Sequence, residues 1–323
     1  MVSECLCKKN QALFTAFHQT KALSSAFNKV RHFQVQTKIV MLKHHFTIFL
    51  MASSLFFTAC QNPNNASDST ADGTDSTSMG QFVDDENFKN QHEMPGEAAP
   101  ANTGKRIEFD TPDGKKGSAY ALMTETPSEE YLLVFHEWWG LNDHIRQEAE
   151  RYFDELDTVN VLALDLYDGE VATTRERAGE LTKSVSEDRA KAIIQGALDM
   201  AGPNARIGTI GWCFGGGWSL KASIQAGDRG EACVMYYGMP VQDKEALMPL
   251  QAPVLAIFAR QDEWITPEVA QSFEDLAVEA DKTVQVQSYD ADHAFANPSS
   301  PRYDQQAART ANQAAQTFLK ANL

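Results

Sequence analysis

The chain has 323 residues and a formal net charge of −16, from 28 Lys and Arg against 44 Asp and Glu. It has no marked cluster of Lys or Arg, so attraction to phosphate backbones or anionic lipid is not expected, and nucleic acid is a poor candidate partner. The five cysteines show neither the number nor the spacing of a disulfide scaffold or a zinc cluster. Each of them needs its own explanation: Cys5, Cys7, Cys60, Cys213 and Cys233.

The N-terminal part has the features of an export signal. Residues 46–59 form an uncharged apolar run behind Lys43, and this run is too short to span a bilayer comfortably. A basic flank, a short apolar run and small residues at its end are typical of a secretory signal peptide, which here would begin at Met41. Its last residues resemble the lipobox of bacterial lipoproteins, with Cys60 as the lipidated residue and Phe57 in place of the usual leucine. The alternative is a buried apolar segment that ends in cysteine by chance.

These features predict how the front of the chain is organised. Residues 1–40 are interpreted as an extension from a misassigned start codon, residues 41–60 as the signal peptide and residues 61–104 as a disordered tether. Residues 61–80 are almost all small or polar and bury too little apolar surface to offset their chain entropy. We therefore expect an exported protein, lipid-anchored to the bacterial cell envelope on its periplasmic or outer side; without the signal the protein would be cytoplasmic.

From residue 105 to the C-terminus the pattern predicts one α/β domain. Residues 106–109 and 118–122, on either side of a Pro-Asp-Gly turn, are expected to form a hairpin. Buried strands are expected at 131–135, 159–164, 207–210 and 254–258, and two more strands at 233–237 and 284–289. Helices are expected at 143–156, 173–200, 267–280 and 302–323. Alternating strands and helices imply a mainly parallel sheet with helices on both faces, which forms its site at the carboxyl ends of the strands.

A nucleophile motif follows the strand at 207–210. The sequence Gly-Trp-Cys-Phe-Gly around Cys213 matches the nucleophile elbow, with cysteine in the place of serine. The turn is so sharp that side chains at Gly211 and Gly215 would collide. A helix that begins at Phe214 would favour the thiolate of Cys213. Cys233, in contrast, is expected to be a buried strand residue.

Two further strand ends supply a base and a group that orients it. His293 follows the strand at 284–289, and Asp262 lies in the loop after the strand at 254–258. Taken singly, His293 could be a surface histidine and Asp262 a helix cap. The chain order Cys, Asp, His is the one that this fold uses for a catalytic triad. The backbone N–H groups of Phe214 and Trp138 are the expected oxyanion donors.

At these motifs the chain resembles the dienelactone hydrolase family, from about residue 105 to the C-terminus. The resemblance rests on His-Glu-Trp-Trp-Gly at 136–140, Asp-Leu-Tyr at 165–167, the segment 211–216, Asp262 and His293. It implies that Glu137 pairs with the resting cysteine and helps to activate it; a solvent-facing glutamate is the alternative. Tyr167 stands at the place of a site tyrosine of the family.

The resemblance breaks down at one substrate contact. The type enzyme of the family grips a substrate carboxylate with arginines, one of them four residues after the histidine, where this chain has Asn297. Arg175, Arg260 or Arg302 could substitute. The five tryptophans fall in the three segments that carry the site, so an aromatic pocket that includes Trp139 is expected, although some of them could fill the core behind the elbow.

The sequence thus predicts a hydrolase of a carboxylic ester or lactone that needs no metal and no organic cofactor. Its partner would be a small-molecule ester or lactone, and the membrane would be contacted only through the lipid anchor. A thioesterase or small-ester hydrolase of the envelope would use the same residues. A binding lipoprotein that keeps the fold without turnover is the alternative from another class. The sequence leaves the oligomeric state open.

Overall fold

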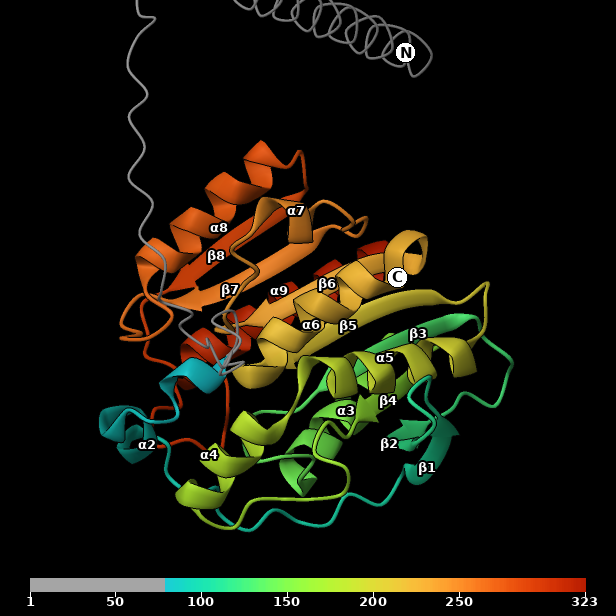
Figure 1. Ribbon diagram of the computed structural model, residues 1–323, viewed down its shortest axis with the longest axis horizontal. Helices are drawn as coiled ribbons and strands as arrows, with labels where there is room; N and C mark the ends of the chain where they lie inside the picture. The colour runs from blue at the N-terminus through green and yellow to red at the C-terminus, as the bar shows by residue number, and fades with distance from the viewer. Residues whose placement is uncertain (1–78) are drawn as a thin grey trace, which may run out of the picture. The chain divides into compact units, whose positions relative to one another are not determined.

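The computed structural model of the protein describes residues 79–323 (Figure 1). The predicted upstream extension, the signal peptide with Cys60 and the first part of the tether lie outside the described residues. No helix within residues 79–323 is long and apolar enough to cross a membrane.

One eight-stranded sheet organises the domain, in the order β1-β2-β4-β3-β5-β6-β7-β8. The β1–β2 and β2–β4 pairs are antiparallel, and the remaining pairs are parallel. The strands are β1 (Lys105–Asp110), β2 (Lys116–Leu122), β3 (Glu130–Phe135), β4 (Asn160–Leu164), β5 (Arg206–Trp212), β6 (Gly230–Tyr236), β7 (Val254–Ala259) and β8 (Val284–Tyr289). The predicted hairpin and the predicted strands are all present.

Burial explains why the strands are so apolar. Nearly every residue of β3 to β7 is buried, because helices cover both faces of the sheet. Edge strand β8 differs: its residues are half-buried or exposed, and glutamines alternate with valines and other residues along it. An edge strand has one neighbour fewer, so it tolerates this polar pattern.

Helices α3 (Asp143–Leu156) and α9 (Gln305–Asn322) pack together on one side of the sheet, and α5 (Glu187–Ala201) and α6 (Phe214–Ala226) pack on the other (Figure 1). Helix α8 (Pro267–Glu279) contacts β7 and β8 and the short α7 (Lys244–Leu247). A 3-10 turn, η2 (Gly227–Arg229), leads into β6. This is the α/β-hydrolase architecture that the sequence predicts.

The single helix predicted over residues 173–200 is wrong. Two helices occupy this region, α4 (Arg175–Ser184) and α5, with a break at Val185 and Ser186. The hydroxyl of Thr174 caps α4, and that of Ser186 accepts the N–H of Arg189 and starts α5. Serine competes with helical hydrogen bonds through its own side chain, so it favours a helix start over a helix interior.

Residues 79–104 are another departure, because the sequence analysis placed them in a disordered tether. They begin with η1 (Met79–Phe82) and α2 (Glu86–Gln91), which pack near α4 and at the edge where the parallel strands end (Figure 1). Met79, Val83 and Phe88 are each at most 2% exposed. We call residues 79–92 the cover. The rest of this segment, residues 93–104, runs to β1 past α3.

Candidate active site

Cys213 occupies the sharp turn between β5 and α6. Its backbone has φ 54° and ψ −119°, a conformation that an L-residue adopts only when its surroundings impose it. A Cβ at Gly211 would collide with the carbonyl of Gly215, and a Cβ at Gly215 would collide with the carbonyl of Phe135. The two glycines therefore allow the turn, as predicted from the motif.

The structure brings the three predicted strand-end residues into one hydrogen-bonded chain. Nε2 of His293 lies 3.3 Å from Sγ of Cys213, and Nδ1 of His293 donates to Oδ2 of Asp262 at 2.6 Å. The second oxygen of Asp262 accepts the N–H groups of Trp264 and Ile265, both at 2.9 Å. These bonds fix the carboxylate, which in turn fixes the tautomer and the direction of the imidazole.

The charges in this chain favour a proton on His293. Burial lowers the pKa of His293, but Asp262 and Cys213 outweigh this effect and raise it to about 10. Burial raises the pKa of Asp262, yet the contact with His293 outweighs it and the net shift is downward. An ionised Asp262 and an imidazole that readily holds a proton are what a cysteine nucleophile needs.

Glu137 lies in the same pocket as Cys213, in the loop after β3. Burial, as the largest influence, raises the pKa of its carboxyl to about 7. Its Oε2 accepts a hydrogen bond from the side-chain amide of Asn297, while its Oε1 is buried and has no partner within residues 79–323. The solvent-facing alternative is therefore wrong. The pairing of this carboxylate with the resting thiol stays a prediction.

The oxyanion candidates occupy suitable elements. Phe214 is the first residue of α6, where backbone N–H groups have no partner inside the helix. Trp138 lines the pocket of Cys213 and is 1% exposed. The hydroxyl of Tyr167 donates to the carbonyl of Trp138 at 3.1 Å and shares a second hydrogen bond with Thr182 at 2.8 Å. Tyr167 thus supports the loop that carries Trp138.

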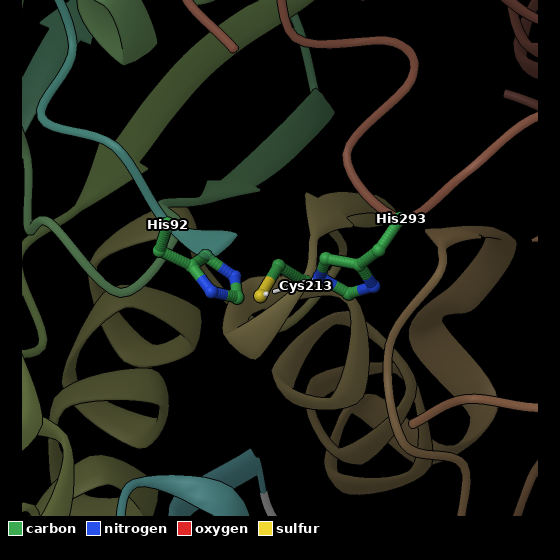
Figure 2. Close-up of side chains that lie close together, drawn as sticks. All are labelled: His92, Cys213 and His293. Atoms are coloured by element: carbon green, nitrogen blue, oxygen red, sulfur yellow. Dashed lines mark hydrogen bonds between the residues drawn. The ribbon is translucent and has the colours of Figure 1, made fainter. Parts of the chain in front are cut away.

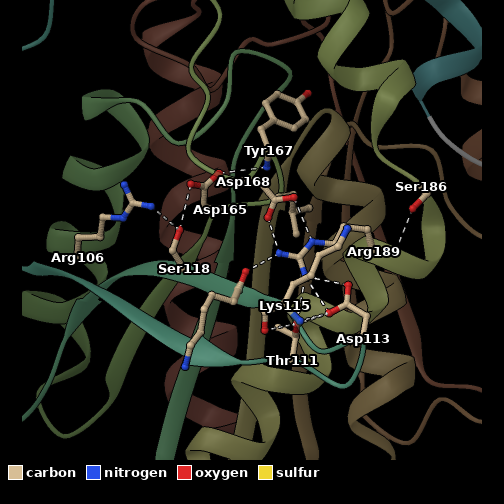
Figure 3. A network of polar contacts seen from close by, with 12 residues as sticks. Arg106, Thr111, Asp113, Lys115, Ser118, Asp165, Tyr167, Asp168, Ser186 and Arg189 are labelled. Carbon is tan, nitrogen blue, oxygen red and sulfur yellow. Dashed lines mark hydrogen bonds and ion pairs between the residues drawn. The ribbon is translucent and has the colours of Figure 1, made fainter.

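A polar network behind the site positions Tyr167 (Figure 3). The carboxylate of Asp165 accepts the backbone N–H of Tyr167 at 3.1 Å and the hydroxyl of Ser118 at 3.2 Å. Arg189, on α5, bridges Asp168 in the same loop and Asp113 in the β1–β2 turn. The network therefore connects the hairpin, the loop after β4 and α5 in one place.

The cover packs over the side chains that surround Cys213. Phe88 contacts the ring edges of Trp138 and Trp264, with centroids 5.5 and 5.3 Å apart. His92 stacks at a tilt on Trp138 and faces His293, with centroids 4.5 and 5.4 Å apart. Trp138 and Trp139 line the cavity of Cys213, and the cover packs against Trp138 and Trp264. The use of these rings as a substrate pocket stays a prediction.

Polar contacts hold the cover against the domain. Asp84 forms an ion pair with Lys183 of α4, and Arg175 donates to the carbonyl of His92 at 2.8 Å. Gln91 accepts a hydrogen bond from Arg302 at 2.7 Å. The cavity left around Cys213 is about 20 Å³, little more than one water needs. An ester cannot reach Sγ while the cover stays in this position.

His92 is the site residue that the sequence analysis missed. It is 7% exposed, and burial together with the neighbouring His293 lowers its pKa to about 3, so the ring is neutral. A weak signal was present: Met79 and Val83 are four residues apart, as are Phe88 and His92, in a largely polar segment. Only the fold shows that this segment brings His92 to the cavity of Cys213.

Two of the predicted substrate contacts lie at the pocket. Trp139 is 4% exposed and lines both the cavity of Cys213 and a neighbouring one of about 110 Å³. Arg302 lines the cavity of Cys213, whereas Arg175 holds the cover and Arg260 is exposed. Asn297, at the place of the family's arginine, binds Glu137.

Fold and site together define an α/β-hydrolase with a cysteine at the nucleophile position. Comparisons with known proteins narrow this class. The model of the dienelactone hydrolase family matches residues 118–323, so the chain belongs to that family.

Relatives and solved structures agree with this assignment. Protein usf of Aquifex pyrophilus is 28% identical over 174 residues, which cover 50% of this chain and 73% of that protein. Carboxymethylenebutenolidase 1 of Cupriavidus pinatubonensis is 25% identical over 220 residues, which cover 64% of this chain and 92% of that protein. The structure of a dienelactone hydrolase-like promiscuous phosphotriesterase from metagenomic libraries has a TM-score of 0.57 at 22% identity. The match covers 68% of this chain and 99% of that protein.

Proposed function

We propose that the protein cleaves a carboxylic ester or lactone through Cys213, His293 and Asp262. Family membership makes it a hydrolase of ester bonds. The observation that carries the finer proposal is the hydrogen-bonded chain from Asp262 through His293 to Cys213, at the strained turn where this fold presents its nucleophile.

The steps follow from these positions. Sγ of Cys213 attacks the carbonyl carbon after its proton has passed to His293, and the N–H groups of Phe214 and Trp138 stabilise the negative oxygen. His293 gives the proton to the leaving alkoxide, and a thioester remains. Water, deprotonated by His293, attacks the thioester; the acid leaves and Cys213 regains its proton.

Substrate entry requires the cover to open. The cavity at Cys213 is too small for an ester, whereas the neighbouring cavity beside Trp139 and Trp212 has about 110 Å³. Once the cover has moved, the space vacated by Phe88 and His92 joins these cavities at the nucleophile. The acyl and alcohol portions of the substrate would then lie on the two sides of Sγ.

Arg302 favours substrates that carry a carboxylate. It lines the cavity of Cys213, and its Nε is buried without a partner among residues 79–323. Its fork can hold a carboxylate in two hydrogen bonds once Gln91 has moved away. Arg302 can therefore take over the binding of a substrate carboxylate from the family's arginine, whose position is occupied by Asn297 in this chain.

The test is hydrolysis of p-nitrophenyl acetate and of a butenolide lactone by the full-length chain. Cys213→Ala is expected to lose turnover. Cys233→Ala is the matched control, because Cys233 is buried in β6 and burial raises its pKa to about 11. Equal turnover in wild type and Cys213→Ala would refute the proposal. No turnover in the chelator-treated wild type and in Phe88→Ala, with Cys213 inert to iodoacetamide in both, would favour a binding lipoprotein.

We also propose that the chain is exported and anchored through a lipid on Cys60. The support is the lipobox-like sequence and the polar residues after it. Mass spectrometry of the native N-terminus tests this: a lipidated Cys60 is expected. An unmodified chain that retains Met1 would exclude the anchor.

A further inference from the structure

We propose that His92, Cys213 and His293 form a transition-metal site, best suited to zinc, that locks the cover over the nucleophile. One nitrogen of each imidazole and the sulfur all lie within 4.8 Å of one another, and all three residues are buried. Figure 2 shows Cys213 between the two rings, with His92 on one side and His293 on the other. Binding would make the enzyme reversibly inactive.

The hydrogen bonds of both histidines leave the correct nitrogen for a metal. Nδ1 of His92 lies 2.6 Å from the carbonyl of Phe88, and because a carbonyl only accepts, Nδ1 carries the proton. Nδ1 of His293 is occupied by Asp262. His92 therefore has its lone pair on Nε2, and Nε2 of His293 becomes a ligand when the proton that it shares with Cys213 leaves. A carbonyl or carboxylate behind Nδ1 is the usual support of a metal-binding histidine.

The Nε2 of His92 gives independent support. It is buried and has no hydrogen-bond partner within residues 79–323, although an unpaired buried acceptor costs about 1–3 kcal/mol. The ring edge that carries Nε2 and the adjacent carbon faces Sγ of Cys213 (Figure 2). A metal ion at this point would satisfy it.

The distances require only a small adjustment. Bonds of about 2.0–2.3 Å to zinc place tetrahedral ligands about 3.4–3.6 Å apart. His293 Nε2 and Cys213 Sγ, at 3.3 Å, already match this separation. Even a pair 4.8 Å apart needs only about 1.2–1.4 Å of movement to reach this separation, and His92 lies at the end of the short α2.

The chemistry of the donors selects the metal. One thiolate and two imidazoles are ligands that zinc and copper prefer over magnesium or calcium. Three protein ligands leave a fourth position for water. The proton shared by Cys213 and His293 is released to solvent on binding. Asp262 behind His293 and Glu137 in the same pocket add negative charge near the cation.

The function of such a site follows from its ligands. A metal bound to Sγ and to Nε2 of His293 removes both the nucleophile and the base from catalysis. Through His92 it also fastens residues 79–92 to the domain. Hydrolysis would resume when the metal is withdrawn and the cover opens.

Cobalt(II) titration of the chelator-treated full-length chain tests the site without relying on turnover. Wild type is expected to develop a thiolate-to-cobalt charge-transfer band and the intense visible bands of tetrahedral coordination, and zinc should displace both. Cys213→Ala should lose the charge-transfer band. His92→Ala should weaken binding by at least about 100-fold, more than the 10–100-fold typical of an outer-shell partner, which is the loss expected for Asp262→Asn.

Val278→Ala is the control, because Val278 lies on α8, away from the cover, and is 76% exposed. It should bind cobalt as wild type does, and far-ultraviolet circular dichroism should show that all variants are folded. Unchanged cobalt affinity in His92→Ala, or no charge-transfer band in wild type, would overturn the proposal. A wild-type chain that hydrolyses no ester in its metal-free form but binds cobalt as expected would reject the hydrolase proposal and leave the metal site standing.

Discussion

Truncation of Phe88 should expose the nucleophile. Phe88 is 1% exposed and lies against Trp138 and Trp264. Burial of a phenylalanine contributes about 1.5–3 kcal/mol, and each edge contact with another ring adds about 0.5–1.5 kcal/mol. The closed position of the cover would therefore lose about 3 kcal/mol in Phe88→Ala. At 1.4 kcal/mol per factor of ten, the open population rises about 100-fold.

The rate of alkylation of Cys213 by iodoacetamide measures this population. Mass spectrometry of the metal-free full-length chain should give a rate about 100-fold higher in Phe88→Ala than in wild type, up to the limit set by a fully open site. Met94→Ala is the control, since Met94 follows the cover and is 53% exposed. Cys233, buried in β6, should stay unmodified in the same spectra. Indistinguishable rates in the three proteins would refute the reasoning that the cover limits access.

Three further substitutions test the site. Asp262→Asn should lower kcat on p-nitrophenyl acetate by about 10⁴-fold, as in a serine triad, because the imidazole loses its orientation; a loss below about tenfold would contradict the triad. Glu137→Gln should remove a pH dependence of the free energy of unfolding. In wild type the pKa of Glu137 is about 7 in the folded state and 4.5 in the unfolded state, so the free energy of unfolding falls by about 3 kcal/mol as pH rises through that window. Urea unfolding at about pH 5 and about pH 8 measures this slope, and an equal slope in both proteins would show that Glu137 is not the group. Arg302→Ala should raise KM for a carboxylate-bearing butenolide by about 10–100-fold relative to KM for p-nitrophenyl acetate, because the loss of its bond to Gln91 affects both substrates alike; equal changes would remove Arg302 from substrate recognition.

The nucleophile and its partners were predictable because their signals are local. A buried strand followed by Gly-x-Cys-x-Gly fixes the place of Cys213, and parallel strands bring the loops of Asp262 and His293 to the same edge. The roles of these residues in catalysis stay predictions, as does the role of Glu137.

The cover was not predictable in the same way. A six-residue helix is marginal by itself, so α2 depends on tertiary contacts. The ion pair of Asp84 with Lys183 and the hydrogen bond of Arg175 to His92 join residues about 80 to 100 positions apart, and no local pattern encodes them. The break at Ser186 was missed for a different reason: the capping serine is a local signal, but helical periodicity continues on both sides of it.

Residues 93–104, between the cover and β1, keep the cover close to the nucleophile. Residues 93–104 run along α3, where Gly96 and Ala99 accept hydrogen bonds from His144 and Gln147 and where Glu150 accepts the N–H groups of residues 102 and 103. This covalent connection makes closure intramolecular, with an effective concentration of about the millimolar range. A single proteolytic cut in it would remove this constraint, and the cover would then be held only by its own packing and polar contacts.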